Sequence, residues 1–381
     1  MDLMTLAELS STYKKLIDIV SDFKPPSIDQ VNEVHSILKN SRRIVTVGVG
    51  RSGDNAEILA KFLRNLGYRE VYGPEDIPFM FSEDDVVIAI SGSGTTTYTV
   101  ETAKVARDAG SEVIAITSSS DSPLLKYATK TIFIPGKTKI GHDDDYYGRQ
   151  LLGHIYAPLT PLGTLFELRT LLFVLSLVGH EFGKGYEITF NELIGGLRAF
   201  TPLDEYFTNF YALLPKPRSQ ANPFTGKTVA VGEGMSGIVA KFFITRLRHC
   251  AKIGEDRECY YWRDRGSISV RKNDLVLVIS GSGEYIPAML AKRAKEKGAK
   301  VVGITSYSDS SLAKISDLII LVPGRIKTEI KGLRSSYYPM DPILSIFELR
   351  TLFLLESFIY LIAETENITE EDMKGLHSDF T

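Results

Sequence analysis

The sequence of 381 residues contains only two cysteines, Cys250 and Cys259, and a single tryptophan. Two cysteines cannot form the disulfide framework of a small secreted domain, so a reducing cytoplasm is the expected compartment. An excess of one charge sign is also missing, because 47 acidic residues face 44 basic ones and leave a net charge of −3. This balance argues against non-specific binding to nucleic acid or to an anionic membrane surface.

Long hydrophobic runs are absent as well. The two longest, near residues 171–179 and 352–363, are shorter than the roughly 18 residues that a membrane-spanning helix requires. The amino-terminus lacks a basic segment followed by an apolar run, so no signal peptide is expected. The composition, with 44% hydrophobic and 24% charged residues, is that of an ordinary soluble globular protein of two to three domains.

The most informative feature of the sequence is an internal duplication. Five pairs of segments match in the same order: Gly48–Gly53 with Gly232–Gly237, Ile90–Gly94 with Ile279–Gly283, Ile116–Leu124 with Ile304–Leu312, Pro135–Gly136 with Pro323–Gly324, and Phe166–Leu171 with Phe347–Leu352. Matched positions are separated by 181 to 189 residues, so the spacing changes only by short loop differences. The pattern predicts two homologous domains, residues 1–199 and 200–381.

Within each copy, short runs of Val and Ile alternate with stretches of helical periodicity such as 55–66 and 100–109. The predicted strands are 43–49, 85–90, 112–117 and 131–134 in the first copy, and 229–231, 275–279, 300–305 and 318–322 in the second. Continuous apolar strands separated by helices indicate an α/β fold, a doubly wound parallel sheet flanked by helices and flavodoxin-like in type. Ligands of such sheets bind at the carboxyl ends of the strands.

The segment after the second predicted strand, Ser91-Gly-Ser-Gly-Thr-Thr-Thr97, consists of small hydroxyl residues and glycines. Glycines let the backbone approach a ligand, and hydroxyls and the N–H groups of a helix start can bind phosphate. A Ser/Thr-rich helix cap is the alternative interpretation. The loop lacks the Gly-Lys-Ser/Thr of a Walker loop, and Gly48–Gly53 does not fit the dinucleotide pattern Gly-x-Gly-x-x-Gly.

Taken as an ordered set, these motifs resemble the sugar isomerase (SIS) domain. The set comprises Gly50–Gly53, Ile90–Gly94, Ile116–Leu124, Pro161–Glu167, and Ile368–Met373 followed by His377. More narrowly, the chain resembles 6-phospho-3-hexuloisomerases, in a tandem form of two SIS domains. The resemblance implies interconversion of fructose 6-phosphate and 3-hexulose 6-phosphate through a cis-enediol, without a metal or other cofactor. It also implies a homodimer, because single-domain members form tetramers.

Measured against the family pattern, the two copies have diverged in complementary ways. The first copy keeps Arg51 and Thr96, whereas the second has Met235 and Tyr285 at the matching positions. The second copy keeps both family histidines, His249 and His377, which the first copy lacks. Each copy keeps a glutamate at the start of a late helix, Glu167 and Glu348.

The complementarity leads to the hypothesis of one intact site per chain, at the interface of the two copies. The expected phosphate ligands are Ser52, Ser91, Ser93 and Thr96. Arg51 would stabilise the enediolate or orient the sugar, either Glu167 or Glu348 would transfer the proton, and His377 and His249 would handle hydroxyl protons. A purely structural role remains the alternative for Arg51, for both glutamates and for both histidines. The run His142–Asp145 is interpreted as a solvated loop, and no metal site is predicted.

Other functions remain open at this stage. An aldose–ketose isomerase resembling arabinose-5-phosphate isomerase would share the loops and the carboxy-terminal histidine. The isomerase half of glucosamine-6-phosphate synthase ranks lower, because the end of the chain offers only Lys374 as a catalytic lysine. A non-catalytic sugar-phosphate-binding regulatory module would tolerate Met235 and Tyr285. The retention of arginine, glutamate and two histidines across the copies favours the enzyme.

Overall fold

A computed structural model describes residues 8–78, 80–136, 163–223, 225–264, 269–325 and 346–376. Tertiary contacts divide the chain into two compact units. Unit N comprises the described residues between Ile19 and Ile194, and unit C comprises those from Gly195 onward together with the residues up to Asp18. The predicted domain boundary after residue 199 stays a prediction, and the contacts change from one unit to the other between Ile194 and Gly195.

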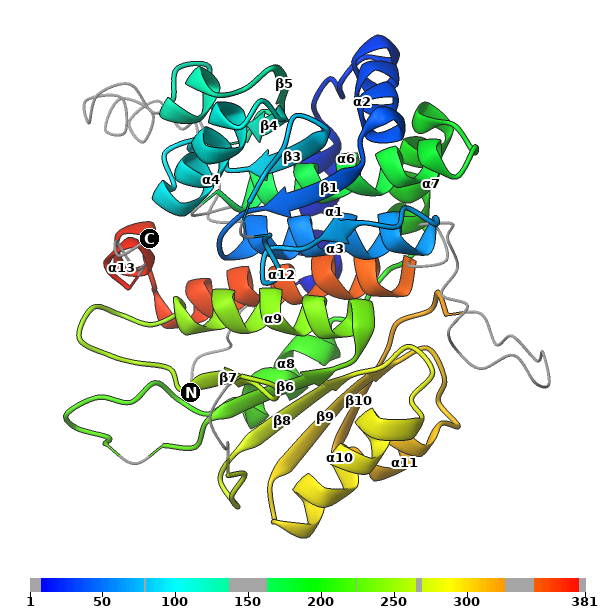
Figure 1. Ribbon diagram of the computed structural model, residues 1–381. Coiled ribbons are helices and arrows are strands. Elements are labelled where there is room, and N and C mark those ends of the chain that lie inside the picture. Colours follow the sequence, from blue (N-terminus) through cyan, green and yellow to red (C-terminus); the bar gives the residue numbers. More distant parts are fainter. Residues whose placement is uncertain are drawn as a thin grey trace. The chain divides into compact units, whose positions relative to one another are not determined.

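Unit N is built on a five-stranded parallel sheet with the order β2-β1-β3-β4-β5 (Figure 1). The strands are β1 (Arg43–Val47), β2 (Val71–Tyr72), β3 (Asp85–Ile90), β4 (Glu112–Thr117) and β5 (Lys130–Phe133). The helices are α2 (Ile28–Asn40), α3 (Arg51–Asn65), α4 (Thr97–Asp108), the 3₁₀ turn η1 (Pro123–Lys126), α6 (Thr164–Glu181) and the part of α7 (Tyr186–Arg198) up to Ile194. The strand order reverses between β1 and β3, which places the ligand-binding edge of this fold at the carboxyl ends of those two strands.

The two faces of this sheet are covered by different helices. On one face, buried Val45, Val87 and Val113 pack with Ala103 of α4 and Leu124 of η1. On the other face, α3 packs on β1 and β3 and is in turn covered by α6. Burial on both faces explains why the strands read as continuous Val/Ile runs.

Unit C repeats the topology with the order β10-β9-β8-β6-β7, again with all strands parallel. The strands are β6 (Thr228–Gly232), β7 (Cys259–Tyr261), β8 (Leu275–Ile279), β9 (Lys300–Thr305) and β10 (Leu318–Leu321). The helices are α8 (Glu205–Leu213), α9 (Gly234–Arg248), α10 (Tyr285–Glu296), α11 (Ser311–Ile315), α12 (Ile346–Glu366) and α13 (Glu370–Gly375). The predicted tandem, doubly wound α/β fold is therefore confirmed.

Sequence periodicity located eight strands to within two residues, but it did not predict β2 and β7. These strands contain only two and three residues, which is too short for an alternating pattern to be recognised. Both cysteines are free and buried, and burial raises the pKa of Cys250 and of Cys259 to about 12. Both side chains are therefore protonated thiols within the core, and neither forms a disulfide.

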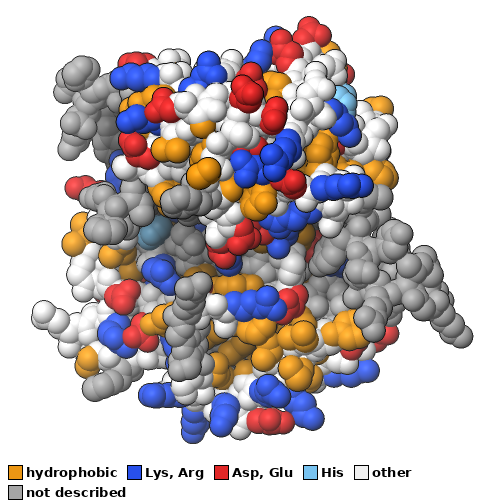
Figure 2. Space-filling view, in the orientation of Figure 1, with side chains coloured by type: hydrophobic (Ala, Val, Ile, Leu, Met, Phe, Trp, Pro, Cys, Tyr) orange, Lys and Arg blue, Asp and Glu red, His pale blue; other side chains and the backbone are white. Residues whose placement is uncertain are grey.

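Near the amino-terminus, Leu9–Ser21 form helix α1, which has apolar residues along one side. Its apolar stripe is almost fully buried, with Leu9, Tyr13, Leu16, Ile17 and Val20 at most 2% exposed. The Tyr13 ring meets the Phe200 ring edge to face at 5.4 Å. None of the helices within the described ranges is both long enough and apolar enough to cross a membrane. Acidic and basic side chains are interspersed over the face of the molecule shown in Figure 2.

A cluster of ionisable groups joins α2 and α6 in unit N. The carboxylate of Glu181, whose side chain is inaccessible to solvent, lies 2.7 Å from Nδ1 of His35 and accepts the Tyr68 hydroxyl at 2.5 Å. The His35 and His180 rings meet edge to face at 5.3 Å. Burial, and secondarily the neighbouring His35, lowers the pKa of His180 below its usual 6.5.

The lowered pKa of His180 predicts a loss of stability in mild acid. Below about pH 6.5 the unfolded chain binds a proton at this position that the folded chain binds only at lower pH. The free energy of unfolding should therefore decrease as the pH falls from 6.5 through the folded pKa. Urea unfolding between pH 7.5 and 5.5 should show a smaller decrease for His180→Gln than for the wild type. Equal decreases in both proteins would contradict this assignment.

Candidate functional site

The sequence places two helix starts at the carboxyl ends of the central strands of unit N. Helix α3 begins at Arg51, four residues after the end of β1, with Gly50 in the left-handed region at φ 58°. Helix α6 begins at Thr164 and packs against α3. Because free N–H groups and the positive end of the helix dipole lie at a helix start, the neighbouring starts of α3 and α6 favour anionic groups.

Glu167, in the first turn of α6, is the best-anchored of the predicted site residues. Its side chain is buried, Oε1 accepts the hydroxyl of Ser52 at 2.7 Å, and Oε2 accepts the amide of Asn55 at 2.9 Å. Asn55 also donates to the backbone carbonyl of Glu167 at 3.1 Å. Donors on both oxygens, together with the helix start, stabilise the ionised carboxylate and fix its direction.

Arg51 is held beside this carboxylate by the second helix start. Its Nη1 donates to the Thr164 hydroxyl at 2.7 Å, and Thr164 is fully buried at the first position of α6. The guanidinium is therefore anchored to the helix that carries Glu167. It places a permanent positive charge near the strand ends, as required of a group that stabilises an enediolate.

The predicted phosphate loop lies between β3 and α4 and is organised by its own hydroxyls. Ser91 Oγ accepts the N–H of Gly94 at 3.1 Å and lies 3.1 Å from Oγ1 of Thr96. Ser93 Oγ accepts both the N–H and the hydroxyl of Thr95, at 3.3 and 2.9 Å. Since Ser93 acts as acceptor in both bonds, its own hydrogen can be donated to an anion.

Packing brings this loop against the first turn of α6. A Cβ on Gly92 would lie 2.8 Å from the Phe166 ring, so only glycine lets the loop approach the residue next to Glu167. The carbonyl of Gly92 accepts the hydroxyl of Ser118, after β4, at 2.7 Å. The structure thus brings Ser91, Ser93 and Thr96 to the same edge of unit N as the Glu167 cluster.

The loop should be sensitive to substitution at Gly94. This residue has a φ of 63°, and an added Cβ would lie 2.2 Å from the Ser122 hydroxyl. Gly94→Ala should cost about 2–4 kcal/mol of unfolding free energy, because steric overlap adds to the left-handed conformation. Gly67 is the matched control: its φ is 93° but its surroundings are open, so Gly67→Ala should cost about 1–2 kcal/mol. Urea unfolding measures the loss of unfolding free energy in both variants. Equal losses would contradict the prediction, because they would show that the loop adjusts to the added Cβ.

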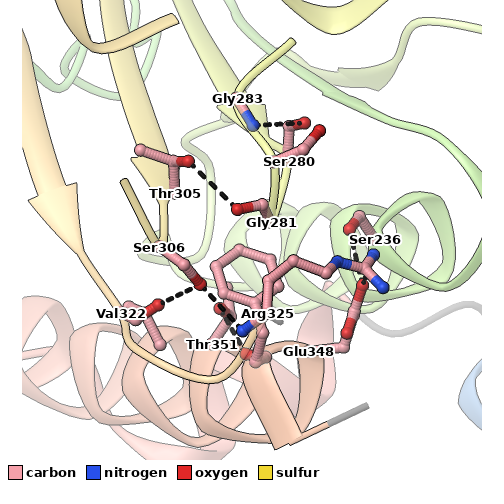
Figure 3. Close-up of polar contacts among 12 residues, drawn as sticks. Ser236, Ser280, Gly281, Gly283, Thr305, Ser306, Val322, Arg325, Glu348 and Thr351 are labelled. Atoms are coloured by element: carbon pink, nitrogen blue, oxygen red, sulfur yellow. Dashed lines mark hydrogen bonds and ion pairs between the residues drawn. The ribbon is translucent and has the colours of Figure 1, made fainter. Parts of the chain in front are cut away.

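The corresponding cluster of unit C is arranged differently (Figure 3). Glu348 is 2% exposed, and its Oε1 accepts Ser236 Oγ at 3.1 Å and Nη2 of Arg325 at 3.0 Å. Val239 stands where unit N has Asn55, and Oε2 of Glu348 has no hydrogen-bond partner within the described part of the chain. Burial raises the pKa of Glu348, with Arg325 and Ser236 acting in the opposite direction.

Of the two predicted histidines, His249 lies within the described residues of unit C. His249 follows the last residue of α9, whereas Ser236 lies in the first turn of that helix. A helix of 15 residues is about 22 Å long, so His249 and Ser236 lie at opposite ends of α9. His377 and the run His142–Asp145 lie outside the described residues. The roles predicted for His249 and His377 stay predictions.

Sequence reasoning missed Asn55 and Arg325. Asn55 follows Ser52 by three residues, so both side chains lie on one face of α3, and its replacement by Val239 is visible when the two copies are aligned. Arg325 directly follows the repeated Pro323–Gly324 pair. The donors of unit N suit a phosphorylated ligand. Across the described ranges, no group of three or more His, Cys, Asp or Glu residues could hold a metal ion.

The sequence of the chain is similar to those of named isomerases. The 3-hexulose-6-phosphate isomerase of Methylomonas aminofaciens is 33% identical over 158 residues, which are 40% of this chain and 80% of that protein. A protein of the same name from Bacillus subtilis is 32% identical over 149 residues, which are 39% of this chain and 76% of that protein. The homologues thus support an isomerase.

The crystal structure of tagatose-6-phosphate ketose/aldose isomerase from Escherichia coli covers 99% of this chain and 98% of its own, with a TM-score of 0.60 and 14% identity. At that identity, the match shows a shared fold. A family model described as SIS domain matches residues 37–144 and 226–347. These two regions make up more than half of the chain, which therefore belongs to the SIS domain family.

Proposed function

We propose that the chain is a phosphosugar isomerase that moves a carbonyl between C2 and C3 of a ketohexose 6-phosphate, interconverting fructose 6-phosphate and 3-hexulose 6-phosphate. The observation that carries the proposal is the buried carboxylate of Glu167, held by Ser52 and Asn55 beside a hydroxyl-lined loop at the strand ends. The similarity to two proteins named 3-hexulose-6-phosphate isomerase supports the choice of reaction.

In the proposed reaction, the loop hydroxyls bind the phosphate and Glu167 transfers the proton. The Glu167 carboxylate removes the hydrogen from C3, and the electron pair of that bond forms the C2–C3 double bond of a cis-enediolate. Arg51 stabilises the negative charge that develops on O2. The proton then returns from Glu167 to C2, while the hydroxyl proton of O3 leaves and O2 becomes protonated. No atom is gained or lost, so the step needs no co-reactant.

We assign the base to Glu167, not to Glu348, because the two carboxylates differ in their partners. Both oxygens of Glu167 accept hydrogen bonds, from Ser52 and from Asn55, which hold this carboxylate in a fixed direction at the strand ends. Oε1 of Glu348 is ion-paired with Arg325, and its Oε2 has no hydrogen-bond partner within the described residues, so this carboxylate is not held in position for proton transfer. The predicted single intact site per chain follows from the same asymmetry.

The proposal includes His249 and His377 as the groups that move the hydroxyl protons. It predicts that His249→Gln and His377→Gln each lower turnover while fructose 6-phosphate still binds. The position matching His377 in the first copy, Leu197, is an unsuitable control: it is fully buried and its carbonyl accepts the Tyr13 hydroxyl. Full activity in both histidine variants would remove them from the mechanism.

The experiment that tests the proposal is a direct assay of product formation. The purified chain is incubated with fructose 6-phosphate, and 3-hexulose 6-phosphate is identified by NMR. Arabinose 5-phosphate, offered in parallel, tests the alternative of an aldose–ketose isomerase. Conversion of fructose 6-phosphate supports the proposal. Conversion of the pentose alone would replace it with the aldose–ketose reaction, and binding without any conversion would indicate a regulatory module.

A further inference from the structure

The Arg325 side chain occupies an unusual place in unit C. Its backbone is anchored at both polar atoms, because the N–H donates to Ser306 Oγ at 3.1 Å and the carbonyl accepts the Tyr307 hydroxyl. From there the side chain extends toward Ser236 and Glu348 (Figure 3). Its Nε lies 2.7 Å from the position of an added Cβ on Gly281. Arg325 therefore lies directly over the loop that matches the predicted phosphate loop of unit N.

The far end of this side chain is fixed by charge. Nη2 of Arg325 lies 3.0 Å from Oε1 of Glu348, whose side chain is 2% exposed, while that of Arg325 is 21% exposed. If Arg325 turned away toward a ligand, the buried carboxylate would keep, among the described residues, the hydroxyl of Ser236 as its side-chain partner. Leaving a buried charge without its partner is strongly unfavourable, so the pair resists opening.

The carboxylates of the two units have different hydrogen-bond partners. In unit N, Asn55 and Ser52 satisfy both oxygens of Glu167. In unit C, Val239 offers no donor, and Oε2 of Glu348 is unpartnered within the described ranges. Arg325 donates to Oε1 instead, so the carboxylate of unit C is stabilised by an ion pair, while that of unit N accepts the Asn55 amide.

We propose that Arg325 is a built-in occupant of the strand-end cluster of unit C, which prevents this unit from binding a sugar phosphate. Arg325 is then the residue that restricts the chain to one functional site. The loop beneath it keeps the elements of an anion site: the Ser280 hydroxyl orders the N–H of Gly283 at 3.1 Å, and α10 begins two residues later. Removing the ion pair should therefore uncover a second, weaker site.

This inference rests on the proposed function, because it takes the site of unit N to bind fructose 6-phosphate. The test is calorimetric titration of fructose 6-phosphate into the full chain, with the number of sites per chain as the readout. Wild type should show one site. Arg325→Ala, and the double variant Arg325→Ala with Glu348→Gln, should show two, the second about tenfold or more weaker because unit C lacks the matching arginine and threonine. The double variant leaves no buried charge unpaired, so it guards against misfolding of the single one.

Adding Ser91→Ala and Ser93→Ala to the double variant weakens the first site and leaves the second to be measured alone. Two sites in wild type, or one in the double variant, would overturn the role of Arg325 and leave the proposed function intact. No site in wild type but one in the double variant would support the role of Arg325 and contradict the proposed function. No site in either protein would contradict both.

Discussion

Replacing Glu167 by glutamine is expected to lower the turnover of fructose 6-phosphate by a factor of about 10²–10⁴, the usual contribution of a positioned general base. Glutamine keeps the size of the side chain but has no basic oxygen for the C3 proton. The fold should survive, because the glutamine oxygen can still accept from Ser52. In addition, Oδ1 of Asn55, which has no partner within the described residues, can accept from the new amide if the Asn55 side chain turns.

Glu348→Gln provides the matched comparison. Since Glu348 occupies the same position in the second copy but pairs with Arg325, its substitution should lower turnover by less than about tenfold. Steady-state kinetics on both variants, with circular dichroism as a check on folding, measures the difference. Equal losses would show that the two carboxylates share the role, and a larger loss for Glu348 would transfer it to unit C.

Substituting Arg246 by alanine is expected to destabilise unit C by about 3–5 kcal/mol, because it leaves a buried carboxylate without its counter-ion. Arg246 in α9 and Glu356 in α12 are 1% and 2% exposed, and Nε and Oε2 are 3.3 Å apart. Nη1 of Arg246 and Oε1 of Glu356 make no hydrogen bond within the part of the chain that is described. The hydrogen bonds of the buried pair therefore do not fully replace those that its charged groups would make with water.

The first copy has two apolar residues at the positions that match this ion pair. Phe62 and Leu175 match Arg246 and Glu356, and both are 2% exposed. The double variant Arg246→Phe with Glu356→Leu should therefore be as stable as the wild type or up to about 4 kcal/mol more stable. Urea unfolding of the single and double variants measures the coupling. A double variant as unstable as Arg246→Ala would show that the ion pair itself supports the packing of α9 on α12.

Most of the fold could be predicted from the sequence because the duplication repeats the motifs that follow the longer strands. Matching Ile90–Gly94 with Ile279–Gly283 fixed both the strand and the loop after it, and four of the predicted strands agree residue for residue with β3, β4, β8 and β9. For Ser52 and Glu167, the sequence predicted that both belong to the site but not that they touch. They are 115 residues apart and make contact because α6 packs on α3.

The parts that could not be predicted depend on side-chain packing. Asn55 looks like an ordinary polar residue of an amphipathic helix until the structure places its amide on Glu167. Arg325 looks like a loop arginine, because the sequence carries no signal for the direction in which its side chain extends. Arg246 lies three residues before His249 in the sequence, and only the structure shows that it is buried and pairs with Glu356.

The most direct test of proton transfer at the site of unit N is solvent exchange. Fructose 6-phosphate is incubated with the wild-type chain in deuterium oxide, and the hydrogen at C3 is followed by NMR. We predict that wild type replaces it with deuterium and that Glu167→Gln loses this exchange while still binding the sugar phosphate. Binding by the wild type with neither exchange at C3 nor formation of 3-hexulose 6-phosphate, or undiminished exchange in Glu167→Gln, would contradict the assignment of Glu167 as the base of a phosphosugar isomerase.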